Sequence, residues 1–184
     1  MLELDQTVVY RHHVCTVASL RENYYAGKDY YELHALFDNS LKLYVAVEDA
    51  VPPALRPTMT RDEALALIDS IPEVEDIDAA ALAEGVDTPT LLDRRIKEEY
   101  SRRLKTFTPE ELLPIMKFAY ERSRKREKNG RNATATDKKY FELAEDLLCN
   151  ELSISLDIDR DDVYDFLTQR IESAMARSKS KQTV

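Results

Sequence analysis

Apolar and polar residues alternate along the chain up to residue 56, as they do in half-buried β-strands. A first apolar run begins at Val8 and a second covers residues 14–20. Turn residues at 26–28 and 38–40 delimit two further runs. Their inward positions are Tyr31, Leu33, Ala35 and Phe37, and then Leu41, Leu43, Val45 and Val47. About four or five short strands on tight turns are typical of a small, strongly bent β-barrel.

Beyond residue 56, apolar residues recur at intervals of three and four, the spacing of amphipathic helices. Helix-start signatures occur at Thr60, Thr88, Thr108, Thr136 and Asp159. The first predicts a helix over 61–71 that Pro72 ends, and Gly130 is expected to end the helix that follows Thr108. The last predicted helix directs inward Val163, Phe166, Leu167 and Ile171. The acidic, alanine-rich segment 73–87 is predicted to be a mobile connector rather than a packed element.

These patterns predict an α+β protein without an internal repeat, in which a small β-barrel is followed by an all-α helical bundle. We place the barrel in residues 1–58, the helical domain in residues 59–176 and a flexible basic tail in residues 177–184. A barrel of this size buries little apolar surface by itself, so it is expected to pack against the helices.

The composition excludes several classes of function. The 184 residues include 26 basic and 35 acidic side chains, and the formal charge of -9 argues against a protein that coats nucleic acid over its whole surface. Only three glycines occur, so no glycine-rich phosphate-binding loop can be formed. The two cysteines are far apart, no apolar run reaches about 18 residues, and the N-terminus lacks the pattern of a signal peptide. We therefore expect a cytoplasmic protein with no membrane contact.

No group of side chains in the sequence predicts catalysis. His12 and His13 are adjacent and His34 falls in another predicted strand, but a metal site usually needs further ligands at defined spacing. Cys15 lies in an alternating strand and is expected to be a small core residue rather than a nucleophile. We therefore expect no enzymatic activity, no metal site and no cofactor.

Basic residues gather in one stretch of an otherwise acidic chain. Residues 106–135 hold seven basic and four acidic side chains, a net charge of +3. The cluster consists of Arg122, Arg124, Lys125, Arg126, Lys128 and Arg131, and a more mixed basic face consists of Arg94, Arg95, Arg102 and Arg103. Two interpretations are open: a surface that contacts the phosphates of a nucleic acid, or solvated cations that complement the dipole at a helix C-terminus.

Tyrosines gather in the barrel region, at positions 24, 25, 30, 31 and 44. They are expected either to pack in the core and rim of the barrel or to form an exposed binding face, because tyrosine is enriched at protein interfaces. The pattern alone does not choose between the two.

Several segments resemble the CarD/CdnL family of bacterial transcription regulators. They are residues 8–15 (VVYRHHVC), 26–33 (AGKDYYEL), 43–50 (LYVAVEDA), 55–57 (LRP) and 137–152 (DKKYFELAEDLLCNEL). Their order and spacing are similar to those of the family from residue 2 to residue 170, nearly the whole chain.

The resemblance implies a Tudor-like (SH3-like) barrel over residues 1–58 that binds the RNA polymerase β subunit, as in the transcription-repair coupling factor. It also implies a helical domain that contacts promoter DNA at the upstream edge of the transcription bubble and stabilises the open complex, without enzymatic activity. By position, the resemblance assigns polymerase binding to Asn23, Tyr25 and Tyr44. The candidates for DNA contact are Arg94, Arg95, Arg122, Arg124, Lys125 and Arg126.

The sequence departs from the family pattern in three places. The glycine expected after the histidine pair is missing, and Ala46 stands where the family has proline. The chain has no tryptophan, although many members use one as a wedge at the edge of the bubble; its place falls near Leu91, which would act as a smaller wedge. The alternative hypothesis is an adaptor of the same fold that binds only proteins and makes no DNA contact.

Overall fold

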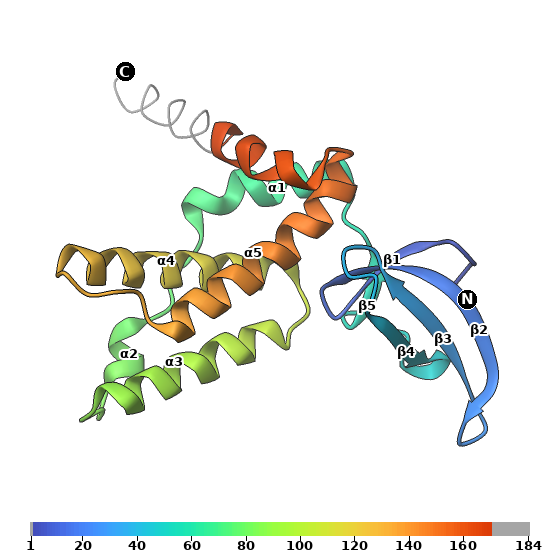
Figure 1. The fold of residues 1–184 in the computed structure, drawn as a ribbon, viewed down its shortest axis with the longest axis horizontal. Helices are drawn as coiled ribbons and strands as arrows, with labels where there is room; N and C mark the ends of the chain where they lie inside the picture. The colour runs from blue at the N-terminus through green and yellow to red at the C-terminus, as the bar shows by residue number, and fades with distance from the viewer. Residues whose placement is uncertain (1, 171–184) are drawn as a thin grey trace.

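The computed structural model describes residues 2–170 and confirms the α+β class. An antiparallel sheet formed by the N-terminal segment is followed by a helical domain, and the two lie at opposite ends of the molecule (Figure 1). The predicted inward position of Ile171 and the predicted basic tail at 177–184 lie outside the described residues.

The sheet contains five strands in the order β4-β3-β2-β1-β5. Their bounds are β1 Thr7–Tyr10, β2 His13–Tyr25, β3 Lys28–Ala35, β4 Lys42–Ala46 and β5 Leu55–Pro57. Val45 of β4 and Leu55 of β5 occupy opposite edges of the sheet, yet both belong to one buried cluster with Val8, Cys15 and Leu33. The sheet is therefore curled around its own small core, as the alternation of apolar residues predicts.

The tight turn between β1 and β2 contains no glycine. Tyr10 pairs with His13 across β1 and β2, which leaves Arg11 and His12 as a two-residue loop with φ of 49° and 74°. Positive φ at both central positions is the signature of a type I′ hairpin turn, which matches the twist of the flanking strands. Arg11 and His12 therefore form this turn without a glycine.

The predicted ends of two strands are wrong. Phe37 and Val47 were expected to face inward, but they are 41% and 38% exposed. β3 ends at Ala35, and the chain leaves β4 after Ala46 to enter the 3₁₀ turn η1 (Val47–Asp49). The alternation of apolar residues continues past the last ladder pair, so it could not mark where each strand stops.

The helical domain contains four longer helices: α1 Arg61–Ser70, α3 Pro89–Leu104, α4 Leu112–Lys128 and α5 Ala135–Leu156. The short elements are η2 Ile71–Glu73, α2 Ala79–Ala83, η3 Pro109–Glu111 and η4 Arg160–Asp162, and residues 163–170 are helical. Thr60 and Glu63 form the predicted capping box, and Thr88 caps α3. The cap of α5 is Thr134, two residues before the predicted Thr136, because its hydroxyl accepts from the Asp137 backbone amide.

The segment 73–87 is not the mobile connector that its composition predicted. Ile77 is 4% exposed in the helical core, and Asp78 caps α2 by accepting hydrogen bonds from two backbone amides. Arg95 of α3 donates to the backbone oxygens of Leu82 and Glu84. The many acidic residues in this segment obscured one buried isoleucine and one helix cap, which together fix its position.

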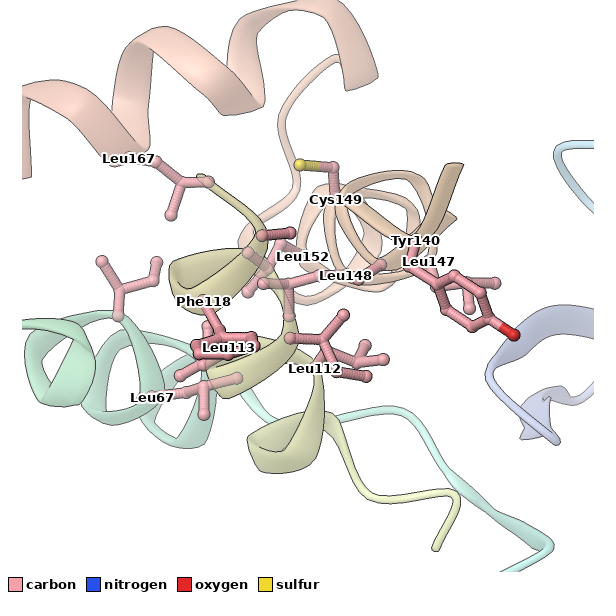
Figure 2. Close-up of a cluster of buried hydrophobic side chains, with 14 of the residues drawn as sticks. Leu67, Leu112, Leu113, Phe118, Tyr140, Leu147, Leu148, Cys149, Leu152 and Leu167 are labelled. Atoms are coloured by element: carbon pink, nitrogen blue, oxygen red, sulfur yellow. The ribbon is translucent and has the colours of Figure 1, made fainter. Parts of the chain in front are cut away.

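The helical core is built mainly where α4 and α5 pack side by side. Leu112, Leu113 and Phe118 of α4 lie close to Leu148 and Leu152 of α5 (Figure 2), and Leu67 of α1 and Leu167 belong to the same cluster. Pairs of this kind follow from the predicted spacing of three and four residues, which puts one apolar stripe on each helix.

A buried ion pair joins the sheet to the helical domain. Arg56 of β5 donates two hydrogen bonds to the carboxylate of Glu151 on α5, at 2.5 and 2.7 Å, and the Met59 backbone amide donates to the same group. Beside it, His12 Nε2 donates to the Leu104 backbone oxygen at 2.9 Å. Burial lowers the pKa of His12, so the ring is neutral in this position.

Candidate functional site

An exposed group of aromatic rings lies on the outer face of the sheet. Tyr24 stacks on Tyr44 with ring centroids 5.1 Å apart and an interplanar angle of 12°, and Tyr30 meets Tyr24 edge-on at 5.8 Å. Tyr44 is 39% exposed and Tyr25 is 70% exposed. We call Tyr24, Tyr25, Tyr30 and Tyr44 the tyrosine surface. Of the tyrosines noted in the sequence, only Tyr31 is a core residue, at 3% exposure.

A bulge in β2 positions this surface. The pairing of β2 with β3 shifts register between Arg21 and Tyr25. Within the bulge Asn23 has φ of 50°, and its backbone amide donates to Asp29 Oδ1 at 2.9 Å. Asparagine tolerates this left-handed conformation better than most residues. Asn23 therefore shapes the backbone beside Tyr24, and it lines a shallow polar hollow together with Lys28 and Glu48.

A buried carboxylate, which the sequence did not single out, supports the tyrosine surface. Glu32 of β3 is directly opposite Tyr44 of β4 and is 4% exposed. It accepts hydrogen bonds from His34 Nε2 at 2.8 Å, from Arg21 at 2.8 and 2.6 Å, and from Ser19 Oγ at 3.1 Å. Only the alternation of residues on β3, which puts a glutamate among outward positions beside a histidine, hinted at this network.

The network makes the stability of the sheet depend on pH in the acid range. Hydrogen bonds from His34 and then Arg21 lower the pKa of Glu32 from 4.5 to about 2. Because the folded-state pKa is lowered, the ionised carboxylate stabilises the fold above pH 4.5, and this contribution is lost as the pH falls through about 2.

Only part of the predicted basic face on α3 is free. Arg95 is bound to the α2 backbone, and Arg103 donates to Glu99 and Glu111. Arg94 is exposed, with its Nε 3.7 Å from Glu98 Oε1. The residues that share a shallow hollow along this helix with Arg94 are Lys97, Glu98, Ser101, Arg102 and Lys105, and Arg102 donates two hydrogen bonds to Glu99. The prediction missed Lys97 and Lys105, which the spacing of the helix places on the same side as Arg94.

The basic residues of α4 likewise include some that are held by hydrogen bonds within the domain and some that are exposed. Arg122 donates to the fully buried Asp137 at 3.1 and 3.2 Å, and Arg126 Nε donates to the Asn132 backbone oxygen at 2.7 Å. Arg124 lies over the Tyr120 ring on the exposed side of α4, 5.9 Å from its centroid. Lys125 has no ion pair among residues 2–170. The structure brings Arg122, Lys125 and Arg126 together at one groove, whereas Arg94 and Arg95 lie on α3.

Both cysteines of the chain, Cys15 and Cys149, are buried and unpaired. Cys15 is fully buried, and desolvation raises the pKa of its thiol to about 12. Residues 2–170 contain no group of three or more His, Cys, Asp or Glu side chains placed to hold a metal ion. Over the same residues, no helix is long and apolar enough to cross a membrane.

Comparisons with known proteins do not identify a family for this chain. No protein-family model matches the chain, and no curated protein matches it.

Proposed function

We propose that this protein is a CarD-like transcription regulator that binds the RNA polymerase β subunit with its sheet domain and promoter DNA with its helical domain. The observation that carries the proposal is the tyrosine surface. Two of its four members, Tyr25 and Tyr44, are residues to which the resemblance assigns polymerase binding, and Tyr24 stacks on Tyr44. Exposed, rigid aromatic groups of this kind are typical binding anchors.

The helical domain supports the second half of the proposal through its charge. The exposed cations Arg94, Arg124 and Lys125 lie on α3 and α4 of a molecule with a net charge of -9. Contacts from these side chains to phosphates would position the protein on a duplex without reading its sequence. The acidic remainder of the surface would repel DNA, which favours one orientation of docking.

The tyrosine surface provides the direct test. Replacing Tyr44 by alanine is expected to weaken binding to purified polymerase β subunit by about 1–3 kcal/mol, because a partly buried interface aromatic is lost. Binding is measured by titration calorimetry with the full chain, and circular dichroism checks that the variant remains folded.

The matched control is Tyr164→Ala, which removes a tyrosine that is 60% exposed in the helical domain. It should bind the β subunit like the wild type. Equal affinities for wild type and a folded Tyr44→Ala variant would contradict the assignment of this surface to the polymerase.

One observation favours the alternative, an adaptor that binds only proteins. Three of the six cations assigned to DNA, namely Arg95, Arg122 and Arg126, are held by hydrogen bonds within the helical domain. The adaptor would bind its protein partner through the tyrosine surface but would not bind duplex DNA at any salt concentration. The regulator would bind DNA with an affinity that falls as salt rises, by up to about 0.9 in log affinity per log salt for each phosphate contact.

A further inference from the structure

A groove of about 560 Å³ lies between α2, α3 and the C-terminal half of α4. We call it the α2–α4 groove. Its floor is apolar and comes from three helices: Leu82 of α2, Leu92 and Ile96 of α3, and Phe118 of α4. The floor side chains provide no hydrogen-bonding group. The volume is within the usual range of small-molecule sites, about 300–1,000 Å³.

One side of the groove is strongly cationic. Arg122, Lys125, Arg126 and Arg131 line it, and none of its lining residues is acidic. Arg122 is tied to Asp137, but Lys125 has no ion pair within residues 2–170, and Arg126 uses only its Nε to hold the Asn132 backbone oxygen. The free nitrogens of Lys125, Arg126 and Arg131 are therefore available to an anion.

An apolar floor beside a cationic side fits a ligand that has one apolar part and one anionic part. A phosphate alone would leave the apolar floor without a partner, and an apolar peptide would leave the cations without one. The backbone of an intact duplex is convex and keeps its bases inside the stack. A nucleotide that is not paired has a flat base that can lie on apolar side chains and a phosphate that can meet arginine and lysine.

We propose that the α2–α4 groove binds an unpaired nucleotide of a DNA strand, with the base against the partly exposed Leu82 and Leu92 and a phosphate against Lys125, Arg126 and Arg131. This inference rests on the proposed function and gives it a more specific partner, the single-stranded part of an opened promoter. No hydrogen-bonding side chain lies on the floor, so binding should depend little on which base is present.

The test uses the full chain and a fluorescein-labelled oligothymidylate of about twelve residues, within the range of known single-strand site sizes. Ala79 lies exposed at the rim of the groove, so Ala79→Glu places a negative charge there. Ala81→Glu on α2 is the matched control, because it makes the same charge change outside the groove. Lys125→Gln and the exposed Lys139→Gln on α5 form a second matched pair.

Fluorescence anisotropy should show that Ala79→Glu and Lys125→Gln each weaken binding of the oligothymidylate by about fivefold or more. The two controls should bind like the wild type. A hairpin duplex is titrated in parallel. If the wild type binds the duplex but both groove variants bind the single strand normally, the groove proposal is overturned and the proposed function remains. If the wild type binds neither DNA, both are overturned.

Free thymidine 5′-monophosphate distinguishes the two possible sources of the nucleotide. It should compete with the oligothymidylate only at concentrations far above those of the labelled strand, because a strand adds neighbouring phosphate contacts. If the free nucleotide binds as tightly as the strand and Ala79→Glu abolishes this binding, the groove serves a free nucleotide, and the strand proposal is wrong.

Discussion

Replacing Asp137 by alanine is expected to destabilise the helical domain by about 3–5 kcal/mol, the cost of breaking a buried ion pair by removing one partner. Asp137 is fully buried at the start of α5. It accepts hydrogen bonds from Tyr100 at 2.8 Å, from Arg122 at 3.1 and 3.2 Å, and from Thr134 at 2.8 Å, so it links α3, α4 and α5. Burial raises the pKa of Tyr100, which keeps its hydroxyl protonated as a donor.

Urea denaturation followed by circular dichroism measures this effect. The control is the adjacent Lys138→Ala, which removes an exposed side chain whose Nζ lies 3.8 Å from Glu142. It should change stability by less than about 0.5 kcal/mol. A loss below about 1 kcal/mol for a folded Asp137→Ala variant would mean that the three donors find other partners. The result also bears on Arg122, whose bond to Asp137 indicates a structural role beside any contact with DNA.

Replacing Glu151 by alanine is expected to cost about 3–5 kcal/mol and to loosen the sheet from the helical domain. Glu151 is 3% exposed, and its removal leaves the Arg56 guanidinium and the Met59 amide without their acceptor. The two domains should then unfold at different urea concentrations. Far-ultraviolet circular dichroism reports largely on the helices, whereas tyrosine fluorescence reports on both domains, with six of the ten tyrosines in residues 1–58, so the two transitions should no longer coincide.

A double variant tests whether the cost comes from the unpaired charge. Arg56→Met combined with Glu151→Leu replaces the ion pair by apolar side chains and should be much more stable than Glu151→Ala. The exposed Glu142→Ala on the same helix serves as the control and should leave the two transitions coincident. Coincident transitions in Glu151→Ala would contradict the role of this pair in holding the domains together.

The sequence predicted those parts of the fold that depend on local spacing. Alternation gave the inward residues of the sheet from Tyr31 to Ala35, and Thr60 with Glu63 marked the start of α1 correctly. The predictions from sequence fail where one contact between residues that are distant in the sequence determines the local structure. Ile77 anchors a segment whose composition suggested a connector, and Thr134 replaces Thr136 as the α5 cap because it also bonds the buried Asp137.

The candidate binding surfaces were harder to predict than the fold, because they depend on contacts between residues that are distant in the sequence. The stack of Tyr24 on Tyr44 requires the bulge at Asn23, which shifts the register of β2 by an amount that no spacing rule specifies. Arg95 and Arg126 look like free cations in the sequence, yet each donates to a backbone oxygen in the fold. Charge clusters are visible in a sequence, but whether a given cation is free depends on the acceptors that the fold brings to it.

The lifetime of open promoter complexes measures whether the protein stabilises the open state, as the proposed regulator should. Purified bacterial RNA polymerase is allowed to open a promoter, and the decay of the complexes is followed after a competitor is added. We expect a longer lifetime when the full chain is present. The effect should be lost with Tyr44→Ala and with the double variant Arg94→Glu, Arg124→Glu, and retained with Tyr164→Ala. A lifetime that the wild-type chain leaves unchanged would contradict the proposed role in promoter opening.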